Sequence, residues 1–227
     1  MARDDASILN VDDLLAAYAL GYFPMARARH EADVVWVLPD QRGVLPLNEA
    51  RAPKKLLRFL RRCPFELRIN TAFQQVIEAC AAPTPGREET WINDAIIETY
   101  CDLHFHGHAH SVECWNGNAL VGGLYGIAIG GIFCGESMFS KEPNASKIAM
   151  LHLIARLKLA GFSLLDTQFH TEHLAQFGVR EMPNNVYQDE LRKLIQVKAD
   201  FTQPPANSSA EILSSTIYVW QSMTQTS

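Results

Sequence analysis

Apolar residues recur along the chain at two spacings, and the changes between them predict the order of the secondary structure elements. From residue 63 onward, the alternation of Phe65, Leu67 and Ile69 predicts a strand, and the next two apolar segments have helical spacing. A glycine-rich run of three strands and a long helix over residues 144–160 follow. A buried strand, a short helix and a last strand complete the pattern, so the predicted order is β-α-α-β-β-β-α-β-α-β.

The first 62 residues contain helix and strand candidates of their own. Asn10 is a typical N-cap at the start of a helix, and Gly21 is expected to end that helix. Val34–Val37 is a strand candidate, and residues 53–62 predict a basic helix. A break in composition at Cys63 suggests a second domain over residues 63–197. Residues 198–227 are rich in Ser, Thr, Pro and Gln, so we expect a mobile tail.

Composition narrows the class of protein. A hydrophobic fraction of 48% and a charged fraction of 20% are typical of a soluble globular chain. No apolar run reaches the roughly 18 residues of a membrane helix. The five cysteines form no C-x-x-C pair, which favours reduced thiols and a cytoplasmic location. We also expect a monomer. A net charge of −5 leaves room only for a local basic patch.

The stretch over residues 107–147 carries the strongest local signals. Asn116-Gly117 between two apolar runs predicts a β-hairpin. The many glycines that follow indicate a strand that passes close to another segment or to a ligand. Glu136 is a lone carboxylate among Phe133, Met138 and Phe139, so we expect it to be partly buried. Either it forms a structural ion pair, or it belongs to a functional site.

Asp166 and Gln168 form a second candidate constellation at the end of a predicted buried strand. In an extended chain their side chains face the same way, since residues two apart share a face. Glu136 ends a strand that is expected to be a neighbour, so two carboxylates and an amide can line one pocket. The alternative is that Asp166 only caps the turn that follows.

Basic residues concentrate before the predicted domain boundary. Seven of the chain's 20 Lys and Arg lie within residues 51–68, with Glu66 as the one opposing charge. They form either a solvated helix face or a phosphate-binding patch. Histidines at 104, 106, 108 and 110 invite a metal site, but no further ligand completes a set with suitable spacing. The basic residues are Arg51, Lys54, Lys55, Arg58, Arg61, Arg62 and Arg68.

The predicted element order is similar to that of the GCN5-related N-acetyltransferases, an α+β fold whose members transfer acyl groups to amines. In that fold an R/Q-x-x-G-x-G/A loop before the long helix holds the pyrophosphate of coenzyme A. Here residues 139–147 occupy that place and contain no glycine. The resemblance therefore covers the fold but not the loop that binds the coenzyme.

A more specific resemblance covers about residues 11–195. The chain resembles the bacterial leucyl/phenylalanyl-tRNA–protein transferases in a series of motifs that stand in the family's order. It departs from them at Met25, where many members have Trp, and at Thr171, where Asn is common. The motifs are Gly21-Tyr22-Phe23-Pro24, Trp36 with Pro39-Asp40 and Arg42, Thr90-Trp91-Ile92, Gly107-His108-Ala109-His110-Ser111-Val112-Glu113, Leu120-Val121-Gly122-Gly123-Leu124-Tyr125-Gly126, Phe133-Cys134-Gly135-Glu136-Ser137-Met138-Phe139-Ser140, Asn144-Ala145-Ser146-Lys147, and Asp166-Thr167-Gln168 with His173-Leu174 and Gly178.

The resemblance implies an enzyme that moves Leu, Phe or Met from aminoacyl-tRNA onto the α-amine of proteins with N-terminal Arg or Lys. The product is then degraded by the N-end rule pathway. The resemblance also implies a small N-terminal α/β domain, here residues 1–62, on a GCN5-like domain, with neither metal nor coenzyme. In this reading Asp166 and Gln168 orient the amine and relay its proton, and Glu136 binds the positive side chain of the acceptor.

The remaining substrate contacts follow from the same resemblance. Leu124 and Met138, with Ser137, are expected to hold the transferred side chain. The aromatic rings of Trp36, Trp91 and Tyr100 are candidates for stacking on the terminal adenosine. The basic helix is expected to hold the acceptor stem through Arg51, Lys54, Lys55, Arg58, Arg61 and Arg62. The rival hypotheses are a GCN5-like acyl-CoA N-acyltransferase and a non-catalytic module that binds tRNA or a degron.

Overall fold

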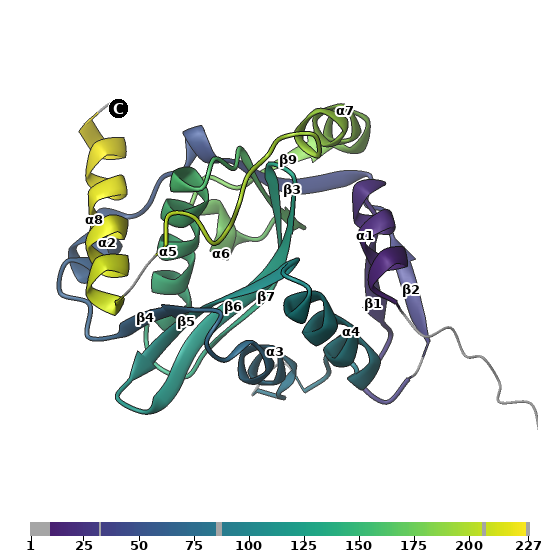
Figure 1. Cartoon of the computed structure of the whole chain (residues 1–227), viewed down its shortest axis with the longest axis horizontal. Coiled ribbons are helices and arrows are strands. Elements are labelled where there is room, and N and C mark those ends of the chain that lie inside the picture. Colours follow the sequence, from purple (N-terminus) through teal and green to yellow (C-terminus); the bar gives the residue numbers. More distant parts are fainter. Residues whose placement is uncertain (1–9, 32, 85–87, 206–207, 226–227) are drawn as a thin grey trace, which may run out of the picture.

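The computed structural model describes residues 10–31, 33–84, 88–205 and 208–225 and shows a mixed α+β fold around one large sheet (Figure 1). Its helices are α1 (Val11–Ala19), α2 (Lys54–Leu60), α3 (Phe73–Ala81), α4 (Asp94–Phe105), α5 (Ala145–Leu159), α6 (Glu172–Ala175), α7 (Asn184–Leu194) and α8 (Ser209–Gln225). Its strands are β1 (Phe23–Ala26), β2 (Val34–Val37), β3 (Gln41–Pro46), β4 (Glu66–Ile69), β5 (Ala109–Asn116), β6 (Ala119–Ile129), β7 (Ile132–Ser140), β8 (Leu164–Gln168) and β9 (Arg180–Pro183).

The seven-stranded sheet has the order β4-β5-β6-β7-β8-β3-β9. Strands β4 to β7 form antiparallel neighbours, and β7 pairs with β8 in parallel. The order of elements from β4 to β9 is the one that the hydrophobic pattern predicts. The predicted hairpin is also present, with Asn116 opposite Ala119 and a φ of +57° at Gly117, a conformation that glycine adopts without strain.

Helices cover both faces of the sheet (Figure 1). Helix α5 lies on one face, with α2 and α8 packed against it, and α3 and α4 lie on the other face. Each side has its own hydrophobic core, which is why β5 is buried along almost its whole length. The antiparallel pair β1–β2 and helix α1 form a small unit beside α4.

The structure divides the chain differently from the predicted boundary at residue 62. Strand β3, from the segment assigned to the small N-terminal domain, lies inside the main sheet between β8 and β9. Helix α2 packs on α5, and its Leu56 and Leu60 belong to the core of that face. The small N-terminal unit is therefore α1 with β1 and β2. The break in composition at Cys63 marks only a turn between α2 and β4.

The segment expected to be a mobile tail contains a packed helix, so that expectation is wrong for residues 209–225. Helix α8 buries Ile212, Val219 and Trp220 against α5, and the Trp220 indole donates a 2.9 Å hydrogen bond to the Leu151 carbonyl. Because Ser, Thr and Gln lie between the apolar residues of this face, the composition of the segment did not indicate a packed helix. Within the described part of the chain, no helix combines the length and apolar character needed to cross a membrane.

Candidate active site

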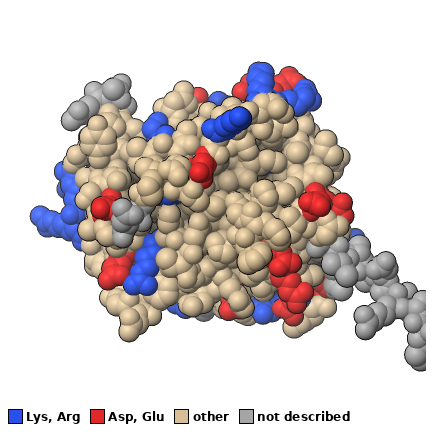
Figure 2. Space-filling view, viewed as in Figure 1, with Lys and Arg blue, Asp and Glu red and all other residues tan. Residues whose placement is uncertain are grey.

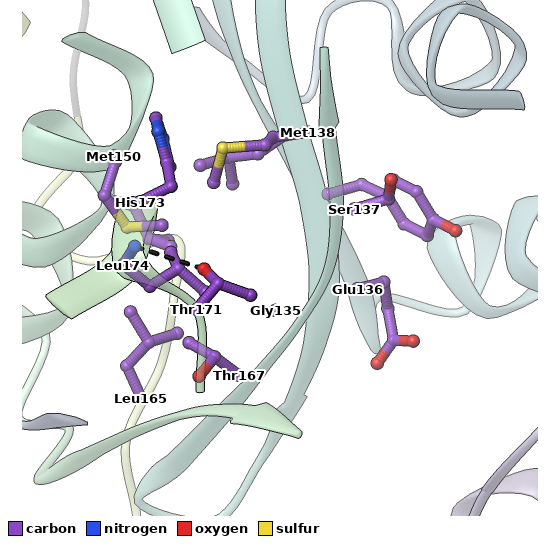
Figure 3. A pocket seen from close by; sticks show the side chains of 13 residues that line it. Gly135, Glu136, Ser137, Met138, Met150, Leu165, Thr167, Thr171, His173 and Leu174 are labelled. Atoms are coloured by element: carbon purple, nitrogen blue, oxygen red, sulfur yellow. Dashed lines mark hydrogen bonds between the residues drawn. The ribbon is translucent and has the colours of Figure 1, made fainter. Parts of the chain in front are cut away.

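A β-bulge places Glu136. Tyr125 of β6 lies opposite Ser137, but the next residue, Gly126, lies opposite Gly135, so Glu136 is an extra residue without a partner. A Cβ on Gly126 would lie 2.2 Å from the Cys134 carbonyl oxygen, so only glycine permits this close approach. Bulges re-aim side chains, and Figure 3 shows the Glu136 carboxylate pointing away from Met138, across the strand.

The Glu136 carboxylate lies in a polar cluster with α1 and α4. Its Oε1 accepts hydrogen bonds from the Tyr18 hydroxyl at 2.7 Å and the Gln168 amide nitrogen at 3.0 Å. Its Oε2 accepts only a longer bond, 3.3 Å, from Tyr100. Burial raises the pKa of Glu136 to about 7, although the Tyr18 hydrogen bond opposes this shift.

The structural ion-pair hypothesis for Glu136 is not supported. Among the described residues, the salt bridges join other carboxylates, and none involves Glu136. A partly buried residue whose carboxylate has no cationic partner among the described residues, and is held by two tyrosines and an amide, has an oxygen available for a positive ligand. The arrangement therefore favours the functional alternative.

Asp166 is completely buried, and both of its carboxylate oxygens accept hydrogen bonds. Arg42 donates from Nε to Oδ1 at 2.9 Å and from Nη2 to Oδ2 at 2.7 Å. The Tyr187 hydroxyl donates at 2.7 Å, and the Gln168 backbone N–H donates at 2.9 Å. Burial lowers the pKa of Arg42, but Asp166 outweighs that effect and holds it above the usual range. Such a carboxylate cannot also contact an incoming amine, so a direct proton-relay role for Asp166 does not fit this geometry.

Gln168 connects the two carboxylates. Its side chain donates to Glu136, and its backbone N–H donates to Asp166, which therefore does cap the turn, as in the alternative hypothesis. Its φ is +55°, a strained conformation for a residue other than glycine, and it is almost fully buried. Strain of this kind concentrates at functional sites. With the amide nitrogen committed to Glu136, the Gln168 amide oxygen can accept a hydrogen bond from a substrate N–H.

An apolar cavity of about 190 Å³ lies beside Gly135 and Glu136 (Figure 3). The structure places Leu124, Ser137 and Met138 in its lining, where the sequence predicted them. The opposite wall comes from α5 and α6. An apolar protein cavity of about 150 Å³ binds benzene, so this cavity can hold a Leu or Phe side chain. The additional apolar wall residues are Met150, Leu153, Leu165 and Leu174.

A basic groove of about 900 Å³ lies between α2 and the N-terminus of α5, and we call it the α2/α5 groove. All six cations predicted to bind tRNA are exposed, and Lys and Arg gather on this side of the molecule (Figure 2). Four of the six line the groove together with Lys147, but Arg51 and Lys54 do not. The four are Lys55, Arg58, Arg61 and Arg62. The seventh cation of the run, Arg68, pairs instead with Glu66 at 2.7 Å.

Helix α6 separates the two hollows. His173 and Leu174 line the apolar cavity, and Gln176, just after the helix, lines the α2/α5 groove. A ligand whose phosphates occupy the groove can therefore reach the cavity by passing α6.

The three aromatic candidates for stacking differ in exposure. Trp36 is 41% exposed on β2, and Trp91 is partly buried beside β1. Tyr100 is fully buried, with its ring edge-on to Tyr125 at 5.6 Å, so it has no free face for an adenine. The prediction that Tyr100 stacks on the adenosine is therefore wrong, and its hydroxyl instead donates a hydrogen bond to Glu136.

His110 has a structural role, because its ring forms a 3.0 Å hydrogen bond with the Asn70 side chain.

The sequence assigned no role to three residues that complete the site. Tyr18 and Tyr187 hold the two carboxylates, and Arg42 neutralises Asp166. The Arg42 guanidinium lies between the rings of Phe23 and Tyr187, at 4.9 and 4.7 Å from their centroids. The signal for Arg42 in the sequence was its place in the family motif of Trp36, Pro39-Asp40 and Arg42, which gave it no role.

Comparison with known proteins identifies the family of this chain. The family model for leucyl/phenylalanyl-tRNA protein transferase matches residues 44–192, and the model for the N-terminal domain of that family matches residues 8–40. The Phenylobacterium zucineum leucyl/phenylalanyl-tRNA–protein transferase is 55% identical over 189 residues, which cover 83% of this chain and 86% of that relative. The Maricaulis maris protein of the same name is 47% identical over 217 residues, or 95% and 97% of the two chains. The chain belongs to the leucyl/phenylalanyl-tRNA–protein transferase family.

Proposed function

We propose that this aminoacyltransferase moves Leu, Phe or Met from aminoacyl-tRNA to the α-amine of proteins with N-terminal Arg or Lys. The product would enter N-end rule degradation. The observation that carries the acceptor assignment is Glu136. Its carboxylate has no cationic partner among the described residues and accepts a hydrogen bond from Gln168, and the strand residues on either side of it line an apolar cavity. Family membership supports the tRNA and protein substrates.

The reaction is aminolysis of an ester. The amine nitrogen bonds to the aminoacyl carbonyl carbon, the ester C–O bond breaks, and the departing ribose oxygen gains a proton. An α-amine has a pKa of about 7.7–8.0, so a useful neutral fraction exists near pH 7. The enzyme therefore has to supply mainly proximity and orientation. The Gln168 amide oxygen would accept an N–H of the attacking amine, since its nitrogen is turned to Glu136.

Asp166 would act through its neighbours rather than on the substrate. Its carboxylate holds the Gln168 backbone in the strained conformation and fixes Arg42 and Tyr187. We therefore assign it a positioning role. Glu136 would bind the acceptor side chain through Oε2, which accepts only the 3.3 Å bond from Tyr100.

The aminoacyl-tRNA would occupy the two hollows on either side of α6. The apolar cavity would hold the transferred side chain, and discrimination against smaller side chains would be about 1–3 kcal/mol per methylene. The α2/α5 groove would bind backbone phosphates, which makes the affinity depend on salt and little on sequence. Trp36 and Trp91 remain our candidates for contact with the terminal adenosine.

We also propose that the fold is GCN5-like. The element order and the parallel pairing of β7 with β8 support this assignment. The absence of glycine from residues 139–147 favours aminoacyl-tRNA over acyl-CoA as the donor. The five cysteines form no disulfide with one another, which supports the proposed cytoplasmic location, where thiols stay reduced.

Transfer of radiolabelled Leu from charged tRNA tests the proposal. The acceptors are three matched proteins with N-terminal Arg, Lys or Ala. We expect label on the Arg and Lys proteins only. Equal label on the Ala protein would contradict the acceptor site. Binding of charged tRNA without transfer would favour the non-catalytic alternative, and calorimetric binding of coenzyme A would favour an acyl-CoA transferase.

A further inference from the structure

A second groove, of about 420 Å³, lies between α2 and α8, and we call it the α2/α8 groove. Helix α2 and its C-cap contribute Lys54, Leu57, Arg58, Leu60 and Arg61. Helix α8 contributes Ile217, Trp220, Gln221 and Thr224. Helix α8 lies beyond residues 44–192, where the family model matches, so the groove is not a feature of the matched region alone.

Each wall of the groove is one face of a helix. On α2 the lining positions 54, 57, 58 and 61 are spaced i, i+3, i+4 and i+7. On α8 positions 217, 220, 221 and 224 have the same spacing. Residues with this spacing form one stripe over two helical turns, so the groove follows both helices for that length. Two adjacent helical stripes form the type of groove into which a third, amphipathic helix packs.

The charged residues that line the α2/α8 groove are all cations on its α2 wall. Lys54, Arg58 and Arg61 are exposed, and none joins an ion pair found among the described residues. The lining residues of the α8 wall carry no charge. The half-buried Leu57 and Ile217 give an apolar floor above the buried Leu60 and Trp220. The spacing of Lys54, Arg58 and Arg61 matches carboxylates three to four residues apart on a facing helix.

We propose that the α2/α8 groove binds an acidic amphipathic helix of a partner protein. The partner's apolar stripe would lie on the floor, and its carboxylates would face Lys54, Arg58 and Arg61. Arg58 and Arg61 also line the α2/α5 groove, so the partner helix and the tRNA phosphates would compete for these two side chains. RNA fits this surface less well, because single-stranded bases need an exposed aromatic face for stacking and Trp220 is only 2% exposed. Phosphates would also leave the apolar floor uncovered.

The test adds negative charge to the uncharged wall. The variant Q221E/T224E changes two exposed α8 residues of the groove and leaves α2 intact. The matched control S215E/S222E adds the same charge to exposed positions on the opposite face of α8. Thermal denaturation checks that both full-length variants fold.

The probe is a fluorescein-labelled helical peptide with a leucine stripe flanked on one side by glutamates. A second peptide carries lysines in their place. By fluorescence anisotropy we expect the full chain to bind the glutamate peptide, and Q221E/T224E to weaken binding about ten-fold through like-charge repulsion. The control variant should stay within about two-fold, and the lysine peptide should not bind.

Three results would overturn the proposal. The first is no binding of the glutamate peptide, or binding that Q221E/T224E leaves unchanged. The second is equal binding of the lysine peptide, which would remove the argument from charge. The third is a short RNA duplex whose binding Q221E/T224E weakens while the peptide does not bind, since the groove would then belong to an RNA surface.

Discussion

Replacing Glu136 by glutamine removes a charge from the site and keeps the size of the side chain. The pKa of Glu136 is about 7 in the folded chain against an ordinary value of 4.5, because burial disfavours the carboxylate. The folded state then holds the proton more tightly than the unfolded state. The stability that this proton provides is fully present below about pH 4.5 and is lost as the pH rises through 7.

The size of the effect follows from the two pKa values. One pKa unit corresponds to about 1.36 kcal/mol, so the wild type should lose about 2–3 kcal/mol between pH 5 and pH 8 through Glu136. Glutamine stays neutral and loses nothing. Between pH 5 and pH 8, the unfolding free energy of Glu136→Gln should therefore rise by that amount relative to the wild type. For a chain of this size, the difference in Tm between variant and wild type should increase by roughly 5–10 °C over the same interval.

Thermal denaturation followed by circular dichroism at pH 5, 6, 7 and 8 measures this difference. Glu98→Gln, at an exposed position on α4, removes the same charge and serves as the control. The Glu136→Gln variant should also lose at least about ten-fold in transfer to N-terminal Arg, because a charge-assisted contact is missing. A Tm difference that does not change with pH would refute the buried-charge argument, and unchanged transfer would refute the acceptor role.

Three further predictions follow from other parts of the site. Tyr187→Phe removes the 2.7 Å hydrogen bond to Asp166 and should cost about 1–3 kcal/mol in urea unfolding, and an unchanged midpoint would contradict the network. Lys55→Ala should reduce the slope of log K for tRNA binding against log salt by about 0.9, and an equal slope would place the phosphates elsewhere. Met138→Trp narrows the apolar cavity and should reduce transfer of Phe more than transfer of Leu, measured as kcat/KM for each charged tRNA. Equal losses would argue against this cavity as the side-chain site.

Local signals in the sequence predicted the local structure well. The alternation of apolar residues gave the order of elements from β4 to β9, and Asn116-Gly117 gave the β5–β6 hairpin. These features depend on neighbours within a few residues, where spacing and turn chemistry are decisive.

Features that join distant segments could not be predicted in this way. Arg42 and Asp166 are 124 residues apart, and no spacing rule places β3 beside β8. The bulge at Glu136 depends on the register between two strands, which a single strand does not determine. Tyr100 carries no sign that its hydroxyl bonds Glu136. Helix α8 went unrecognised because its apolar face is spread among Ser, Thr and Gln.

The most direct test of the account is the single-turnover rate of Leu transfer by Gln168→Asn. Asparagine tolerates the positive φ and keeps an amide, but it is one methylene too short to reach both Glu136 and the amine. We predict a rate about 100-fold lower at saturating acceptor, because a misplacement of about 1 Å has that effect, with the Kd for Leu-tRNA unchanged. A wild-type rate in this variant would contradict the claim that Gln168 positions the attacking amine.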